Sequence, residues 1–218
     1  SNLFGQMRSW RHSIHSYPET AFEEVRTSQI VAEELTKMGI EVHCGLATTG
    51  VVGILKCGNS SKNIALRADM DALDLTELNT FSHSSKIPGK MHACGHDGHT
   101  AMLLGAAKYL SQTRNFSGTV YFIFQPAEEN RAGAKVMIDE GLFKKFPIQA
   151  VYGMHNMPHV PVGLFGVRTG PVMAAADNFE VLIKGKGCHA AEPQKGVDPI
   201  YVGSEVVLAL QRIVSRSV

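Results

Sequence analysis

Apolar runs of strand length recur along the chain, separated by segments with helical periodicity. The runs contain few charged residues and little alternation of polar and apolar positions, which is typical of strands buried on both faces of a parallel sheet. Helices between such strands cover the two faces, so the pattern predicts an α/β fold with three layers and a mainly parallel sheet. The predicted strands are "GVVGILKC" at 50–57, "KNIALRADM" at 62–70, "GTVYFIFQPA" at 118–127 and "AVYGMH" at 150–155.

Local signals place the individual elements. The turn-rich "GNSS" at 58–61 separates the first two strands, which could therefore pair as a hairpin. The run "VYFIFQPA" at 120–127 is apolar apart from Gln125 and is expected at the centre of the sheet. Thr20 and Glu23 form a capping box that predicts the start of a helix, and Gly39 predicts its end. The predicted helices cover 21–38, the segment opened by the histidine-rich cluster at 92–99, and 133–141.

The pattern changes after residue 174. The segment 178–187 alternates like a half-exposed strand, and Asp198-Pro199 then opens a helix that reaches Val214. A single strand and helix bury too little surface to be stable alone. We therefore predict a first domain over 1–174 and the incomplete start of a second domain over 175–218.

Composition and charge narrow the classes of partner. The 218 residues carry a formal net charge of +1 without a run of like charges, which gives no electrostatic reason to expect nucleic acid or an anionic membrane. A small ligand of modest charge fits better. The sequence has no apolar stretch long enough to span a bilayer and no signal-peptide pattern at its start, so we expect a cytoplasmic protein. The four cysteines are widely spaced, which argues against a disulfide framework or a zinc knuckle.

Side chains that can bind metals or move protons follow the ends of the predicted strands. In an open α/β sheet, ligands collect at the carboxyl ends of the strands. The groups found there are aspartates, a cysteine and histidine cluster, a pair of glutamates and a further histidine. They are Asp69, Asp71 and Asp74, then Cys94, His96, Asp97 and His99, then Glu128 and Glu129, and finally His155.

Cys94 and His96 give the most specific single signal among these groups. Residues two apart in an extended segment point to the same side, so this pair could share one ion. Thiolate, imidazole and carboxylate ligands together suit zinc or a neighbouring first-row metal better than calcium or magnesium. The alternative is a polar loop with a buried free cysteine and histidines that cap a helix.

The glutamate pair and the aspartates also have two interpretations. Behind a central strand, Glu128 and Glu129 are two charges that need partners, so one could bind a metal and the other could take a proton from water. The alternative is a solvated turn. Asp69 and Asp71 alternate along their segment, so only one of them is expected to face the site and fix a ligand histidine. The alternative for either is the cap of a helix or turn.

Seven blocks of sequence resemble the N-acyl-amino-acid amidohydrolases of the aminoacylase/carboxypeptidase metallopeptidase family, which includes hippurate hydrolases and auxin-conjugate hydrolases. The resemblance covers nearly the whole chain and implies a zinc-exopeptidase-like fold. It makes 1–174 the catalytic domain and 175–218 the first strand and helix of an α+β lid and dimerisation domain. The blocks are "HSYPETAFEEVRT", "LRADMDAL", "MHACGHDGHTAMLLGAA", "FIFQPAEENRAGAKVMI", "YGMHNMP", "GLFGVRTGPVMAAADNFEV" and "GKGCHAAEPQKGVDPI".

The resemblance also implies roles for individual residues. Glu128 matches the general base, Asp71 the acid that orients a ligand histidine, and His189 a lid histidine that reaches the substrate carbonyl. The alternative for His189 is a surface histidine at the end of a strand. One or two divalent metal ions are implied, with zinc first and manganese, cobalt or nickel as alternatives. The implied metal ligands are Cys94, His96, Glu129 and His155, whereas His99, His12, His15, His43, His83, His92 and His159 are expected to be structural or surface residues.

The implied activity is hydrolysis of the amide bond of a small, hippurate-like N-acyl or N-aroyl amino acid, in a homodimer formed through the lid domain. The family has a further histidine ligand after the lid that these 218 residues do not contain, so the chain resembles an N-terminal portion of the enzyme. The alternatives are a non-catalytic metal- or ligand-binding protein of the same fold, and an inactive fragment. The adjacent Glu128 and Glu129 favour the enzyme, because a binding protein needs no free base beside a ligand glutamate.

Overall fold

The computed structural model describes residues 3–174 and 177–217. They fall into two compact units, one that ends at Pro161 and one that begins at Val162. The predicted domain boundary lies further along the chain, and residue 175, with which the predicted second domain begins, is outside the described residues. That boundary stays a prediction. Every helix in the described ranges is too short or too polar to cross a membrane.

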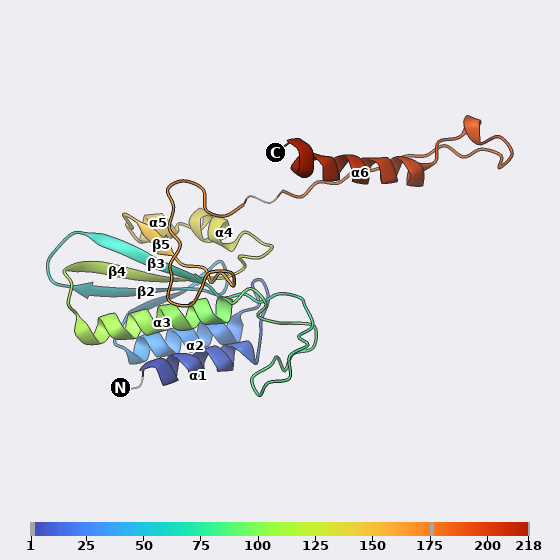
Figure 1. Cartoon of the computed structure of the whole chain (residues 1–218). Coiled ribbons are helices and arrows are strands. Elements are labelled where there is room, and N and C mark those ends of the chain that lie inside the picture. The colour runs from blue at the N-terminus through green and yellow to red at the C-terminus, as the bar shows by residue number, and fades with distance from the viewer. Residues whose placement is uncertain (1–2, 175–176, 218) are drawn as a thin grey trace. The chain divides into compact units, whose positions relative to one another are not determined.

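One mixed sheet forms the middle of the first unit (Figure 1). Within the described residues it has five strands in the order β1-β2-β4-β3-β5. β3 pairs in parallel with β4 and β5, whereas β2 is antiparallel to both β1 and β4. All the strands except β2 therefore run in one direction. The strands are β1 (Glu41–Leu46), β2 (Gly50–Cys57), β3 (Asn63–Asp69), β4 (Gly118–Gln125) and β5 (Val151–Gly153).

The central position predicted for β4 is confirmed, but the predicted hairpin between β2 and β3 is wrong. β4 lies between these two strands and pairs with both of them. It is apolar and buried along nearly its whole length, and a place between two neighbours gives it that burial. β2 instead forms a hairpin with β1, a mostly exposed strand that the hydrophobic pattern did not predict.

Helices cover both faces of the sheet and complete the three predicted layers (Figure 1). β4 contributes alternate side chains to two cores. Phe122 and Phe124 are buried toward the first three helices, and Tyr121 and Ile123 are buried toward the next two. Full burial of one such side chain stabilises the fold by about 1.5–3 kcal/mol. The helices are α1 (Leu3–His15), α2 (Val25–Lys37) and α3 (His96–Thr113) on one face, and α4 (Gly133–Asp139) and α5 (Leu142–Lys145) on the other.

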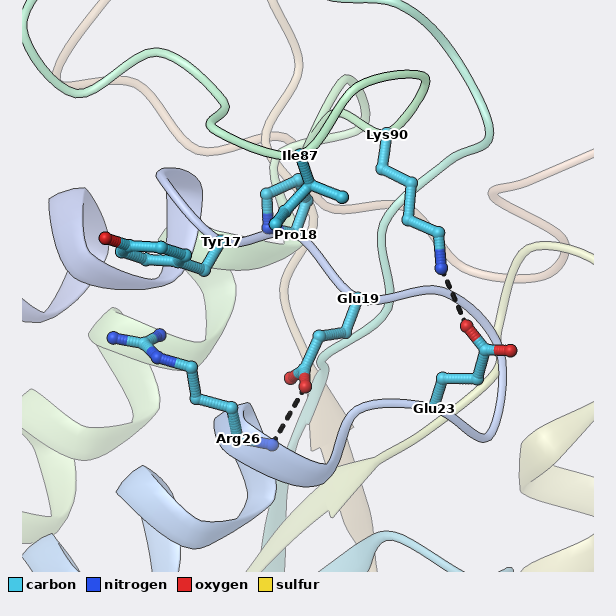
Figure 2. Close-up of a pocket in the computed structure, with 7 residues that line it drawn as sticks. All are labelled: Tyr17, Pro18, Glu19, Glu23, Arg26, Ile87 and Lys90. Atoms are coloured by element: carbon cyan, nitrogen blue, oxygen red, sulfur yellow. Dashed lines mark hydrogen bonds and ion pairs between the residues drawn. The ribbon is translucent and has the colours of Figure 1, made fainter.

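Helix α2 begins four residues later than predicted, because its first turn is capped from a distance. Glu19 Oε1 accepts a hydrogen bond from the N–H of Arg26 at 2.9 Å, and Glu19 Oε2 accepts one from the N–H of Thr27 at 2.8 Å. Glu23, from the predicted capping box, instead pairs with Lys90 at 2.7 Å. Figure 2 shows both glutamates in the wall of one surface pocket. The helix is confirmed, and the capping box as its start is wrong.

The second unit contains α6 (Pro199–Ser217), which confirms the predicted helix. Asp198 Oδ1 accepts a hydrogen bond from a backbone N–H of the first turn at 2.8 Å, so this residue caps the helix. The predicted strand over 178–187 is wrong, and a single isolated bridge joins Lys186 to Val197. A strand needs a neighbouring strand for its backbone groups, and the described residues of this unit contain none.

Candidate metal centre

Three strand ends and the start of one helix bring the predicted site residues to one edge of the sheet. β3 ends at Asp69, and the parallel register pairs this residue with the last residue of β4. The segment after β3, which carries Asp71, therefore lies beside the segment after β4, which carries Glu128. β5 ends two residues before His155, and α3 begins at His96. The site thus forms at the carboxyl ends of parallel strands.

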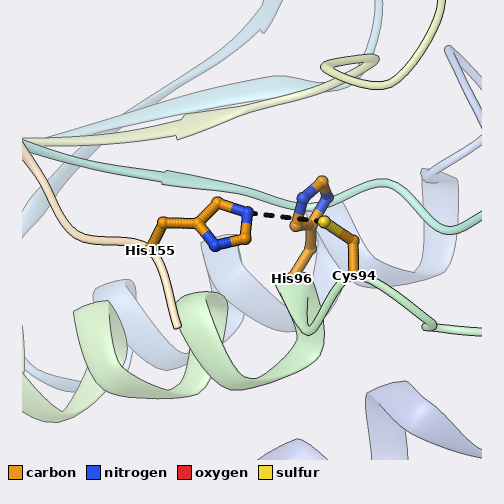
Figure 3. A group of neighbouring side chains, drawn as sticks. All are labelled: Cys94, His96 and His155. Atoms are coloured by element: carbon orange, nitrogen blue, oxygen red, sulfur yellow. Dashed lines mark hydrogen bonds between the residues drawn. The ribbon is translucent and has the colours of Figure 1, made fainter. Parts of the chain in front are cut away.

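Cys94, His96 and His155 form a first group of potential metal ligands (Figure 3). Cys94 Sγ lies 3.4 Å from His155 Nε2, and one ligand atom from each of the three residues lies within 4.8 Å of the others. The turn between Cys94 and His96 differs from the extended backbone that we expected, because Gly95 is left-handed with a φ of 92°. A side chain at Gly95 would also collide with that of Asn156.

Asp71 holds His96 in one orientation. His96 Nδ1 lies 2.9 Å from the backbone oxygen of Asp71 and 3.2 Å from Asp71 Oδ1. Both oxygens accept, so Nδ1 carries the proton and Nε2 keeps a lone pair that can bind a cation. Asp71 Oδ2 accepts a hydrogen bond from the backbone N–H of Glu129 at 2.9 Å. One buried carboxylate therefore fixes both the imidazole and the loop after β4.

Asp69 faces the same site as Asp71, so the expectation that only one of them does is wrong. Asp69 Oδ1 accepts a hydrogen bond from His99 Nδ1 at 2.6 Å, and Asp69 Oδ2 lies 3.6 Å from His96 Nε2. The strand ends at Asp69, so alternation no longer governs the direction of Asp71. Asp69, His96 and His99 form a second group of potential ligands. The structural role predicted for His99 stays a prediction.

Glu128 and Glu129 approach His96 from the loop after β4. Glu128 Oε2 lies 3.9 Å and Glu129 Oε1 lies 3.7 Å from His96 Nε2. In the described part of the chain, His96 Nε2 and Glu129 Oε1 are buried and make no hydrogen bond. An unpaired buried polar group costs about 1–3 kcal/mol, and a cation between these two atoms would satisfy both. The nitrogen, sulfur and oxygen donors fit a divalent first-row metal.

The carboxylates give the site an excess of negative charge. Burial raises the pKa of Glu128, and the neighbouring carboxylate of Glu129 raises it further. Burial, assisted by Glu129, raises the pKa of the Cys94 thiol to about 12. Burial alone would lower the pKa of His96, but the hydrogen bond to Asp71 and the negative charges of Asp69, Asp71 and Glu129 raise it overall. A cation would reverse the bias against the thiolate, because positive charge favours the ionised form.

Comparison with known proteins supports this arrangement. The profile described as peptidase family M20/M25/M40 matches residues 65–217, a range that includes every candidate ligand described above. The chain belongs to this peptidase family. In this M20 chain, the match begins within β3 and continues into α6.

The M20 chain is similar to several curated hydrolases. It is 49% identical over 217 residues to the hippurate hydrolase of Campylobacter jejuni, and the match covers 100% of this chain and 56% of that one. It is 46% identical over 217 residues to the IAA-amino acid hydrolase ILR1-like 4 of Arabidopsis thaliana, and the match covers 99% of this chain and 49% of the relative. It is 43% identical over 210 residues to the N-acetylcysteine deacetylase of Bacillus subtilis, and the match covers 95% of this chain and 55% of the relative. The chain spans about half the length of these relatives.

Solved structures share the fold. A Bacillus subtilis protein described as a dinuclear metal-binding peptidase of the M20 family matches with a TM-score of 0.74 and 41% identity, over 78% of this chain and 48% of that one. A Staphylococcus aureus protein described as an aminohydrolase matches with a TM-score of 0.78 and 34% identity, over 98% and 57%. These matches confirm the M20 fold class.

The remaining predicted residue, His189, lies in the second unit. It is exposed, and its Nδ1 accepts a hydrogen bond from the N–H of Ala191 at 3.1 Å. The predicted metal ligands, Glu128 and Asp71 all lie in the first unit. The metal and catalytic roles of all these residues stay predictions. Sequence reasoning missed Asp69 as a residue that faces the site. Arg67, two positions earlier and so on the same face of the strand, could have indicated it, because a buried carboxylate needs a partner and Arg67 Nη1 lies 2.7 Å from Asp69 Oδ2.

Proposed function

We propose that this chain carries most of the catalytic site of a metal-dependent amidohydrolase that cleaves the amide bond of N-acyl or N-aroyl amino acids. The observation that supports this best is a pair of buried ligand atoms, His96 Nε2 and Glu129 Oε1, that make no hydrogen bond within the described residues and lie beside the half-exposed carboxylate of Glu128. The relatives named hippurate hydrolase and N-acetylcysteine deacetylase support an acylated amino acid as the substrate class.

The ligands for one or two divalent ions are Cys94, His96, Glu129 and His155. Zinc suits this mixture of sulfur, nitrogen and oxygen best, and manganese, cobalt and nickel are the alternatives. When bound, such an ion supplies Lewis-acid polarisation of the amide carbonyl and lowers the pKa of water. The proposal is supported by the potential ligand groups of this site and by the dinuclear relative.

Glu128 acts as the general base. It takes a proton from the attacking water and passes it to the leaving amine nitrogen, so that the products are a carboxylic acid and a free amino acid. Its carboxylate makes no side-chain hydrogen bond within the described residues, and its raised pKa brings it closer to neutral pH. Asp71 keeps the free nitrogen of His96 turned toward Glu128 and Glu129.

The enzyme acts as a homodimer through the second unit, in the cytoplasm, and His189 contacts the substrate carbonyl. Support for the dimer comes from α6, where Val207 is 58% exposed and Val214 is 75% exposed. Exposed apolar side chains gathered on one helix are typical of an interaction surface. Support for the compartment comes from the free state of the four cysteines.

Replacement of the proposed base tests the mechanism. In the full-length, metal-loaded enzyme, Glu128→Gln should keep the metal content and lower kcat by about two to four powers of ten. The readout is release of glycine and benzoate from hippurate. Glu33→Gln, an exposed glutamate on α2, is the matched control and should keep full activity. Substantial turnover by Glu128→Gln would assign the base elsewhere, and failure of the loaded wild type on a panel of N-acyl amino acids would contradict the substrate class.

A further inference from the structure

Glu24 is a buried acid outside the metal centre. It is 0% exposed, although it lies in the loop directly before α2. Its Oε2 accepts a hydrogen bond from the hydroxyl of Thr49 at 2.6 Å, and its Oε1 accepts one from the backbone N–H of Ala127 at 2.9 Å. Burial raises the pKa of Glu24, and these two donors offset part of that rise. A carboxylate is costly to bury, and the two hydrogen bonds of Glu24 go to one hydroxyl and one peptide group.

That peptide group begins the loop of the candidate site. Ala127 has a φ of 54°, a left-handed conformation that costs a residue with a side chain about 1–2 kcal/mol. The preceding Pro126 has no N–H, so Ala127 offers the first backbone donor after β4. The carbonyl of Ala127 accepts a hydrogen bond from the N–H of Gly133 at 2.9 Å. The N–H and the carbonyl of this strained residue are therefore both hydrogen-bonded, and Glu24 is the partner of the N–H.

The direction of Glu128 depends on the backbone around it. On one side, the Ala127 N–H is bound by Glu24. On the other side, the N–H of Glu129 donates to Asp71 Oδ2 at 2.9 Å, and the N–H of Glu128 also faces that carboxylate. The Glu128 carboxylate makes no hydrogen bond within the described ranges, and its one charged contact, with His96 Nε2, is as long as 3.9 Å, so its direction is set mainly by the backbone.

We propose that Glu24 is a positioning residue for Glu128 and Glu129. By holding the Ala127 N–H, it keeps the loop after β4 in the left-handed conformation that turns both carboxylates toward His96. The inference rests on the proposed function, which gives these carboxylates their roles. Without the acceptor, the Ala127 N–H is buried and unpaired. A return of the Ala127 φ to negative values then relieves both the cost of this unpaired group and the cost of the left-handed conformation. That change rotates the peptide that leads into Glu128.

Three substitutions separate positioning from general stability. Glu24→Ala removes the acceptor for Ala127. Glu24→Gln keeps one side-chain oxygen for the Ala127 N–H, while its amide can donate to the hydroxyl of Thr49. Thr49→Val is the matched control, because it removes the other hydrogen bond of the same buried carboxylate and leaves Ala127 untouched. If Glu24→Ala does not fold, Glu24→Asp takes its place, because the shorter side chain withdraws the acceptor and keeps the charge.

The measurements are kcat and KM on hippurate with the metal-loaded, full-length enzyme, the melting temperature, and hydrogen exchange of the Ala127 amide in the metal-free protein. Glu24→Ala should lower kcat about ten- to a hundredfold, with KM within about threefold of the wild type, because small misplacements of a catalytic group cost this much. It should also speed exchange of the Ala127 amide by about tenfold or more, the effect of losing a single hydrogen bond. Glu24→Gln should restore kcat to within about fivefold, and Thr49→Val should lower only the melting temperature.

Two results would overturn the inference. One is a Glu24→Ala enzyme that loses melting temperature as Thr49→Val does but keeps kcat, which would make Glu24 merely structural. The other is an Ala127 amide that exchanges at the same rate in Glu24→Ala and in the wild type. The exchange measurement needs no substrate or metal. It therefore tests the clamp on Ala127 even if hippurate and its analogues are not substrates and the proposed function fails.

Discussion

At the scale of single residues, the surroundings of Cys94 disfavour its thiolate form. Burial and the adjacent carboxylates raise the pKa of this thiol to about 12, yet a thiolate is the form that binds metal. With Cys94 as the proposed ligand, metal binding would release the thiol proton and make the metal affinity of the site depend on pH. As a proposed direct ligand, Cys94 should still contribute more to the metal affinity than a residue that only orients a ligand.

The substitution Cys94→Ala should lower zinc affinity by more than the roughly ten- to a hundredfold that the loss of an outer partner of a ligand costs. Equilibrium dialysis against buffered free zinc, followed by elemental analysis, measures the effect. Cys44→Ala is the control, because Cys44 is an exposed free cysteine on β1. Equal zinc content in Cys94→Ala and the wild type would remove Cys94 from the ligand set.

Residue identity predicts the chemistry of the site but not its full membership. The types of residue from Cys94 to His155 are compatible with a metal site, but the set of ligands followed only from the resemblance to a family. Asp69 escaped because alternation was extended past the end of β3. The sequence did not indicate the proposed role of Glu24, because that role depends on a contact with Ala127, 103 positions away. In its local sequence, Glu24 is an ordinary acid before an amphipathic helix. Long-range contacts of this kind leave no periodic signal.

At the scale of elements, two glycines with different surroundings lie at the start of α3. Gly95 is left-handed with a φ of 92°, and an added methyl group there would collide with Asn156. Gly98 lies within the first turns of the same helix, and an added methyl group there would meet only Arg11 Nε, at 3.8 Å. The first glycine is required by the turn between two candidate ligands, and the second is not.

Gly95→Ala should therefore lower the free energy of unfolding by about 1–2 kcal/mol or more and weaken metal binding, because Cys94 and His96 flank the strained position. Gly98→Ala should raise the free energy of unfolding by about 0.5–1 kcal/mol, the helix preference of alanine over glycine. Urea denaturation of the metal-free proteins and zinc titration measure both effects. A Gly95→Ala protein as stable as the wild type would mean that the turn adapts without strain.

The hydrophobic pattern predicted the strands β2 to β5 and the helices α2, α3, α4 and α6, because each has a clear period or a continuous apolar run. It did not predict which strands are neighbours, since an apolar run indicates burial but not its partner, and so β2 and β3 were paired wrongly. It overlooked β1, whose side chains are mostly exposed. It also produced a strand over 178–187, where alternation is present but the described part of the second unit contains no neighbouring strand.

At the scale of the whole molecule, His15 ties α1 to two other parts of the first unit. Its Nδ1 lies 2.9 Å from Asp97 Oδ2 on α3, and its Nε2 lies 3.1 Å from Glu77 Oε1 in the loop after β3. The hydrogen bond to Asp97, helped by Glu77, raises the pKa of His15 above its usual 6.5 although burial opposes the shift. The protonated imidazole therefore stabilises the folded state. This contribution is complete below pH 6.5 and is lost as the pH rises through the folded value.

His15→Gln should consequently lower the free energy of unfolding more at pH 6 than at pH 9. His12→Gln gives the contrast, because burial and the neighbouring His83 lower the pKa of His12, so its removal should favour the folded state at pH 6 relative to pH 9. Urea denaturation of the wild type and both variants at the two pH values tests these signs. A His15→Gln loss that is the same at both pH values would mean that folding does not raise the pKa of His15.

The placement of β4 between β2 and β3 has a consequence for the order in which the protein is made. Residues 50–69 leave the ribosome well before residue 118, so β2 and β3 wait with unpaired edges until β4 arrives between them. Unpaired edges of this kind are templates for aggregation. The arrival of β4 joins β2 to β3 and, in the same step, carries the loop with Glu128 to the loop with Asp71. A nascent chain would thus lack the full set of proposed ligands until β4 has paired with both strands and His155 has been made.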